Sequence, residues 1–178
     1  MRKVLLFVLG AVGLLVLAIA ITIAVADETK PTGKPGPDAD RLAQKIIEWT
    51  QPQAWAQTGA IRWNFGGRFD HVWDRQRGFS RVNWGPYEVL LDLSTQSGVV
   101  RVDGQVTDGE RAEDLRKKAY GRWINDSFWL HPFDGVFDPN TQRAIVDTPD
   151  RGPALLVTYG GGGLTPGDSY LWFADETG

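Results

Sequence analysis

The chain contains two histidines, and each is followed three residues later by an aspartate, in HVWD at residues 71–74 and HPFD at residues 131–134. A histidine beside a carboxylate can act as a general base, so His71 or His131 could serve a hydrolase of glycans or esters. On a strand, however, His71 and Asp74 face opposite sides of a sheet and cannot bind one metal ion together. We therefore expect histidines that make structural hydrogen bonds, with the hydrolase as an alternative.

Other patterns that could carry chemistry are incomplete. The glycine run 160–163 lacks the lysine and the following helix of a phosphate-binding loop, so we expect a loop between two strands. Asp134, Asp138 and Asn140 lack the ligand spacing of a calcium loop. The chain has no cysteine, which excludes disulfides, cysteine-ligated zinc and a thiol nucleophile. We expect no catalytic residue, no metal and no cofactor.

An apolar run, Val4–Ala26, opens the chain after Arg2 and Lys3. As a helix at about 1.5 Å per residue it would be about 34 Å long, enough for a bilayer core of about 30 Å. The basic residues before it place the N-terminus in the cytoplasm and the remainder outside. Residues 24–26 also have the small-x-small form of a signal-peptide cleavage site, although the usual apolar core is only about 7–15 residues. We expect residues 1–26 to be a membrane anchor, or a signal peptide cleaved after Ala26, and export in both cases.

The exported part is acidic. Leaving out Arg2 and Lys3 reduces the 19 basic residues to 17, against 22 acidic ones, for a net charge of −5. No run of basic residues is present, so nucleic acid is not an expected partner. Residues 27–37 are rich in proline, glycine and charge, and we expect a flexible linker there, followed by one domain over residues 38–178.

The domain starts with a helical pattern and continues with strands. The first helix is expected to begin near Asp38 or Asp40 and to end at Pro52. Apolar residues then alternate with polar ones between glycine-containing turns, which is typical of antiparallel hairpins. The expected strands lie at residues 60–65, 69–74, 78–84, 87–94 and 98–105.

A second helix is expected over residues 107–125, where Thr107 and Glu110 have the spacing of a capping box. Its apolar stripe would lie on the sheet. The stripe consists of Ala112, Leu115, Ala119 and Trp123. Strand patterns then resume at residues 127–130, 142–148, 153–159 and 168–175.

The late strands are apolar on both faces, with Leu155 and Val157 on one face and Ala154 and Leu156 on the other. Both faces therefore need cover. Two helices could cover one face, and the other would curl over itself or over a ligand. The expected fold class is α+β, a curved antiparallel β-sheet in the form of an open half-barrel with two covering helices, preceded by the N-terminal transmembrane or signal helix.

Residues 175–178 resemble the start of a hairpin turn after the apolar strand 170–174. Such a strand would leave an adhesive edge if it ended the sheet. We expect that the domain lacks its last strands because the chain is a fragment, or that a protein partner pairs with this edge.

The aromatic and apolar residues of the predicted strands are the remaining functional signal. They form either an ordinary core or the wall of an apolar groove that takes a lipid chain or stacks on a sugar. The candidate ligand-binding residues are Trp63, Phe65, Trp73, Trp84, Tyr87, Leu91, Tyr170 and Trp172.

Two segments, VLLDLSTQSG at residues 89–98 and YLWFADETG at residues 170–178, resemble strands of the lipoprotein-carrier superfamily of the bacterial envelope, the LolA- and LolB-like domains. The order of expected elements over residues 38–178 is similar as well. The resemblance implies a half-closed sheet with helices over its concave side and an apolar cavity for acyl chains. The chain departs from these carriers because it has no lipid-bearing cysteine and has an anchor where a shuttle protein would be soluble.

The expected function is that of a non-catalytic, membrane-tethered envelope domain that binds a lipid or acylated ligand in an aromatic-lined cavity. Its partners would be that lipid or acyl chain and the cytoplasmic or inner membrane, reached through Val4–Ala26. The domain is expected in the periplasm or at the cell surface, or in secreted form if the chain is cleaved after Ala26. The alternative is a structural or sensory module that binds a protein at an exposed sheet edge.

Overall fold

The structure, a computed structural model, describes residues 30–174. The expected anchor, Val4–Ala26, and the expected turn at residues 175–178 lie outside the described residues. The chain divides into two units, Met1–Thr32 and Gly33–Gly178, and every element below belongs to the second. Within the described part, no helix has the length and the apolar character that crossing a membrane requires.

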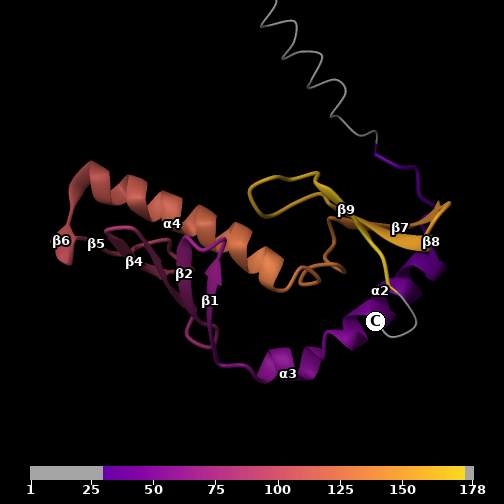
Figure 1. Cartoon of the computed structure of the whole chain (residues 1–178), viewed down its shortest axis with the longest axis horizontal. Coiled ribbons are helices and arrows are strands. Elements are labelled where there is room, and N and C mark those ends of the chain that lie inside the picture. The colour runs from indigo at the N-terminus through magenta and orange to yellow at the C-terminus, as the bar shows by residue number, and fades with distance from the viewer. Residues whose placement is uncertain (1–29, 175–178) are drawn as a thin grey trace, which may run out of the picture. The chain divides into compact units, whose positions relative to one another are not determined.

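The described elements form an α+β fold with two antiparallel sheets (Figure 1). The helices are α2 (Pro37–Trp49), α3 (Pro52–Gln57) and α4 (Gly109–Leu130). The strands of the six-stranded sheet are β1 (Ala60–Phe65), β2 (Phe69–Asp74), β3 (Phe79–Trp84), β4 (Tyr87–Asp92), β5 (Gly98–Val102) and β6 (Gln105–Thr107). The strands of the three-stranded sheet are β7 (Thr141–Thr148), β8 (Gly152–Tyr159) and β9 (Ser169–Trp172).

The six-stranded sheet is a meander in which each strand pairs with the next, and it is not closed. Strands β1 to β4 lie where the alternating pattern predicted them, but the expected strand at residues 98–105 is wrong, because the chain turns at residues 103–104 and forms the two strands β5 and β6. The β5–β6 turn shows why: Asp103 and Gly104 both have positive φ, 49° and 78°. Two such residues between strands match the twist of a hairpin, and Asp-Gly is among the sequences that favour this geometry.

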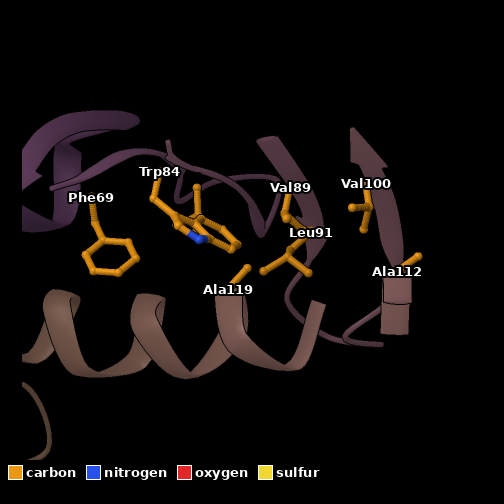
Figure 2. Close-up of a cluster of buried hydrophobic side chains, with 8 residues drawn as sticks. Phe69, Trp84, Val89, Leu91, Val100, Ala112 and Ala119 are labelled. Carbon is orange, nitrogen blue, oxygen red and sulfur yellow. The ribbon is translucent and has the colours of Figure 1, made fainter. Parts of the chain in front are cut away.

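Helix α4 covers one face of this sheet (Figure 1). The predicted stripe is confirmed, because its four residues all belong to the cluster packed between α4 and the strands. Figure 2 shows Ala119 of the helix below Trp84 and Leu91 of the sheet, with Val100 and Ala112 at the far end. Small alanines let the helix approach the sheet closely, so the large side chains of the strands fill the layer between them.

Both expected ends of α4 are wrong. The N-cap is Asp108, without a side-chain capping bond, because Thr107 pairs with Val100 as the last residue of β6. The expected strand at residues 127–130 is the last turn of α4. The helix ends at Leu130, with His131 as its C-cap, because Pro132 disfavours helical geometry in the residue before it.

The late strands form a sheet of their own rather than extending a single sheet. Helix α2 covers it, and the buried Ala43 and Ile46 of α2 lie in one cluster with Leu155 and Val157 of β8. The two helices thus cover two different sheets. The two sheets also differ in burial. Strand β8 is buried at four successive positions, whereas more and less exposed side chains alternate along β1.

The domain also begins earlier than expected. Lys34, which the sequence placed in the linker, forms a two-way backbone pair with Ile145 of β7, with N···O distances of 2.8 and 2.9 Å. Helix α2 follows at Pro37, and Pro52 starts the short helix α3 instead of only ending a helix. Thr50 and Gln51 link α2 to α3, and the left-handed conformation of Gln51 interrupts the helical path.

Candidate functional site: an aromatic cavity at the end of α4

A cavity of about 400 Å³ lies at the C-terminal end of α4. Its wall combines Trp73 of β2, the last two turns of α4, the segment before β7, and the hairpin that joins β8 to β9. Ligand pockets typically have volumes of about 300–1,000 Å³ and mostly apolar or aromatic walls. The cavity is therefore large enough for a small ligand or for part of a larger one.

Four aromatic rings form one cluster in this wall. The Phe128 ring centroid lies 5.3 Å from those of Trp129, Tyr159 and Tyr170. The rings of Trp129 and Tyr170 meet edge to face, with centroids 5.4 Å apart. Edge-to-face and tilted pairs are the favoured arrangements of aromatic rings. The four side chains thus hold one another in place.

Two apolar side chains of the wall remain accessible. The exposed fraction is 46% for Trp129 and 57% for Leu164. A methyl group added at Gly121 of α4 would lie 3.7 Å from Leu164 Cδ1, so the loop that carries Leu164 lies against this side of the helix. Large apolar side chains exposed together at a cavity are typical of a binding site.

The glycine run belongs to the β8–β9 hairpin loop, as predicted, and not to a phosphate-binding turn. Tyr159 N–H donates to Asp168 O at 2.9 Å, and Gly167 N–H donates to Tyr159 O at 2.7 Å, which closes the loop at its base. Gly162 and Gly163 have positive φ, 74° and 65°, a geometry that favours glycine. The run therefore lets the chain turn back over α4.

The cavity wall is negatively charged. Asp134, Asp138 and Asp168 line it, and its lining contains no lysine or arginine. The Tyr159 hydroxyl donates to Pro132 O at 2.6 Å. Burial, the neighbouring Tyr170 and the charges of Asp134 and Asp138 raise the pKa of Tyr159 to about 12. Tyr159 is therefore neutral at physiological pH.

His131 is the histidine that lines the cavity. Its ring stacks on Trp55 of α3 with centroids 4.2 Å apart, and its Nδ1 lies 3.1 Å from Asp134 Oδ1. The indole N–H of Trp55 donates to the other oxygen of Asp134 at 3.3 Å. His131, Trp55 and Asp134 thus connect α3 to the cavity wall.

His71 is fully buried, and its contact is not with Asp74 of the HVWD pattern. Its Nε2 lies 2.8 Å from Asp126 Oδ2 of α4, and Asp126 is fully buried as well. Arg122 and Asn125 donate to the other oxygen of Asp126 at 2.5 and 2.9 Å. Burial lowers the pKa of His71, and the bond to Asp126 opposes this without outweighing it. The expectation of a hydrogen-bonded structural histidine is confirmed for His71.

The structure does not bring the eight candidate ligand-binding residues together. Trp73 and Tyr170 line the cavity. Phe65, Trp84, Tyr87 and Leu91 pack in the core between the six-stranded sheet and α4. Trp172 packs against the core of α2 and the three-stranded sheet, and Trp63 stacks on His71 with centroids 4.5 Å apart. These six residues pack against other side chains and do not line the cavity.

The candidate set lacks four aromatic residues of the wall, which are Trp123, Phe128, Trp129 and Tyr159. Trp123 was assigned to the core stripe, and Phe128 was assigned to a strand that does not form. A usable signal was the density of aromatic residues around His131, which follows FWL directly. Pro132 after it predicts a helix end, and side chains at a helix end can face a cavity.

No protein-family model, curated protein or solved structure matches this chain. Among residues 30–174, no group of three or more histidines and carboxylates is arranged to hold a metal ion. The site is therefore interpreted from its own geometry.

Proposed function

We propose that this chain is a non-catalytic binding domain of the cell envelope that holds a lipid or acylated ligand in the cavity at the end of α4. The observation that carries the proposal is the cavity of about 400 Å³, with an aromatic wall and with Trp129 and Leu164 accessible beside it. Apolar walls favour the apolar part of an amphiphile, because its transfer from water is favourable.

The proposal includes a membrane tether at Val4–Ala26, with the domain outside the cytoplasm. This part rests on the apolar run and on Arg2 and Lys3 before it. The finer fold that we propose is a curved, open half-barrel like that of the lipoprotein carriers. The core between α4 and the six-stranded sheet is closely filled, so the proposed ligand lies beside this core and not within it.

A binding role fits the two histidines better than hydrolysis does. His71 is fully buried against Asp126, so a substrate could not reach it without opening the core. His131 lines the cavity beside Asp134, and a hydrolase would have to use this histidine. If the role is binding alone, the His131→Gln variant should still bind the ligand. The proposal would be contradicted if the parent chain hydrolysed a bound ester or glycan and the His131→Gln variant did not.

The test is photo-crosslinking of the full chain in the membranes of the cells that make it. Leu164 is replaced by p-benzoylphenylalanine, with Val106 of β6 as the matched control, since Val106 is 60% exposed and does not line the cavity. We expect a discrete adduct of lipid size at position 164 and none at position 106. The proposal is wrong if position 164 gives no adduct or the same adducts as position 106.

The same experiment examines the alternative of a protein-binding module. Among the described strands, β9 lies at one edge of the three-stranded sheet, and a partner strand could pair there. Phe173, which follows β9, is 44% exposed. The same photo-crosslinking residue is therefore also placed at position 173. Adducts of protein size at positions 164 and 173, in place of lipid-sized ones, would favour this alternative.

A further inference from the structure

We infer that the ligand of the cavity carries a positive charge, as a substituted ammonium group beside its apolar part. This inference rests on the proposed binding function and specifies the class of ligand. Three features of the cavity support it: its carboxylates, the absence of basic side chains from its lining, and the cluster of aromatic rings.

The three carboxylates have no strong cationic partner. Within residues 30–174, no lysine or arginine makes an ion pair with Asp134, Asp138 or Asp168, and the histidine beside Asp134 is charged only when protonated. Asp168 accepts hydrogen bonds from the hydroxyls of Thr165 and Tyr170 at 2.5 and 3.4 Å, which orient its carboxylate without neutralising it. The negative charge of the wall is thus available to a ligand.

An anionic head group does not fit this wall. A phosphate or a fatty-acid carboxylate would meet three carboxylates and would find no lysine or arginine among the lining residues. Like charges brought together in a partly dehydrated cavity repel each other, and specificity commonly arises from such repulsion. Burial is the main cause of the raised pKa of Tyr159, and the charges of Asp134 and Asp138 add to it.

The aromatic cluster suits a cation that carries carbon substituents. The ring centroids of Phe128, Trp129 and Tyr170 lie 5.3 to 5.4 Å from one another, and the faces of aromatic rings, unlike their edges, are electron-rich. An ammonium group over an aromatic face is attracted by the ring quadrupole, and quaternary ammonium ligands are bound in this way. Aromatic rings supply this attraction while the carboxylates supply the counter-charge.

The experiment compares three small soluble probes that share a benzyl group and differ in charge. They are benzyltrimethylammonium, benzyl alcohol and phenylacetate, and none needs a micelle to dissolve. Binding to the full chain in lipid nanodiscs is measured by calorimetry, with empty nanodiscs as the blank. We expect benzyltrimethylammonium to bind at least about tenfold more tightly than either other probe, a difference of about 1.4 kcal/mol.

The variants remove charge without changing shape. Asp138→Asn is the main variant, and Asp138→Asn combined with Asp168→Asn is the stronger one. Asp150→Asn, in the exposed β7–β8 turn, is the control with the same change in net charge, and it does not line the cavity. We expect the double variant to weaken binding of benzyltrimethylammonium about tenfold while binding of benzyl alcohol stays unchanged. The Asp150→Asn control should bind all three probes as the parent chain does.

Each outcome decides between the two proposals. If benzyl alcohol or phenylacetate binds as tightly as the cation, or if both aspartate variants keep the cation preference, the inference about charge is wrong and the binding function stands. If none of the probes binds at millimolar concentration and position 164 also gives no lipid adduct, both proposals fail. If no probe binds although position 164 gives a lipid adduct, only the inference about charge is overturned.

Discussion

His71 Nε2 lies 2.8 Å from Asp126 Oδ2, and both side chains are fully buried between β2 and α4. The pair joins the sheet to the helix by a polar contact inside a mostly apolar layer. Arg122 takes part through Asp126, and its guanidinium also lies 4.5 Å from the ring centroid of Phe69. Three side chains, those of His71 in β2 and of Arg122 and Asn125 in α4, thus depend on one carboxylate.

Removing this carboxylate should destabilise the fold. Asp126→Ala leaves His71 Nε2 and the Arg122 guanidinium without their acceptor, and we expect a loss of about 3 kcal/mol in the free energy of unfolding. Urea unfolding measures this change. Asp150→Ala, in an exposed turn, is the control and should change stability by less than about 0.5 kcal/mol. Equal effects of the two variants would show that the buried pair contributes nothing.

Stability should depend on pH through His71. Its pKa is lowered by burial from the ordinary value of 6.5. Below about 6.5 the unfolded chain therefore binds a proton that the folded chain does not, and the free energy of unfolding falls by up to about 1.4 kcal/mol per pH unit until the folded pKa is reached. Above about 6.5 the contribution of His71 is fully present.

The measurement is urea unfolding between pH 8 and pH 5. His71→Gln should lose most of this pH dependence, although it also lowers stability at pH 8. His131→Gln is the matched control, since it removes the other histidine of the chain and should keep the dependence. A slope that survives in His71→Gln would assign the titration to another group.

Two tryptophans should behave in opposite ways when they are truncated. Trp84 is buried in the core below the six-stranded sheet, so Trp84→Ala should lower the free energy of unfolding by about 3–5 kcal/mol. Trp129 is 46% exposed at the cavity, so Trp129→Ala should cost less than about 1 kcal/mol and should weaken ligand binding. Parallel unfolding and crosslinking experiments compare them. A stable Trp84→Ala chain that has lost its ligand would place the site in the core instead.

Substitutions of Gly121 test whether the β8–β9 loop contributes to ligand binding. Gly121→Ala places a methyl group in ordinary contact with Leu164, so it should keep binding, and it should raise helix stability by about 0.5–1 kcal/mol. Gly121→Trp should push the loop from α4 and reduce binding. Arg111→Trp is the control, because Arg111 is exposed on the same helix and does not line the cavity. Unchanged binding in Gly121→Trp would remove the loop from the site.

The sequence predicts the first four strands of the meander well because they carry a strong local signal. In β1, the alternation of Ile61, Trp63 and Phe65 with polar residues matches the alternating burial of the structure. The signal of the Asp103-Gly104 turn is equally local, although the expected strand at residues 98–105 passed over it. Each strand also pairs with its neighbour in sequence, so no long-range information is needed to arrange the sheet.

The cavity could not be predicted in this way, because it is a product of contacts between distant segments. Trp73 and Tyr170 were both candidates, but they stand in different sheets and meet only at the end of α4. The register of the late strands shows the same limit: Val157 lies opposite Tyr170 in β9 and opposite Arg143 in β7. A single misassigned segment, residues 127–130, concealed the helix end from which the wall is built.

Helix α4 packs against the six-stranded sheet along one part of its length and supplies the cavity wall with its last turns. Ligand binding in the cavity and folding of the core are therefore thermodynamically linked. A ligand that binds only the folded chain, at a hundred times its Kd, would raise the free energy of unfolding by about 2.7 kcal/mol. Chains without ligand would unfold more often and would be degraded faster. The amount of this protein in a cell would then follow the supply of its ligand.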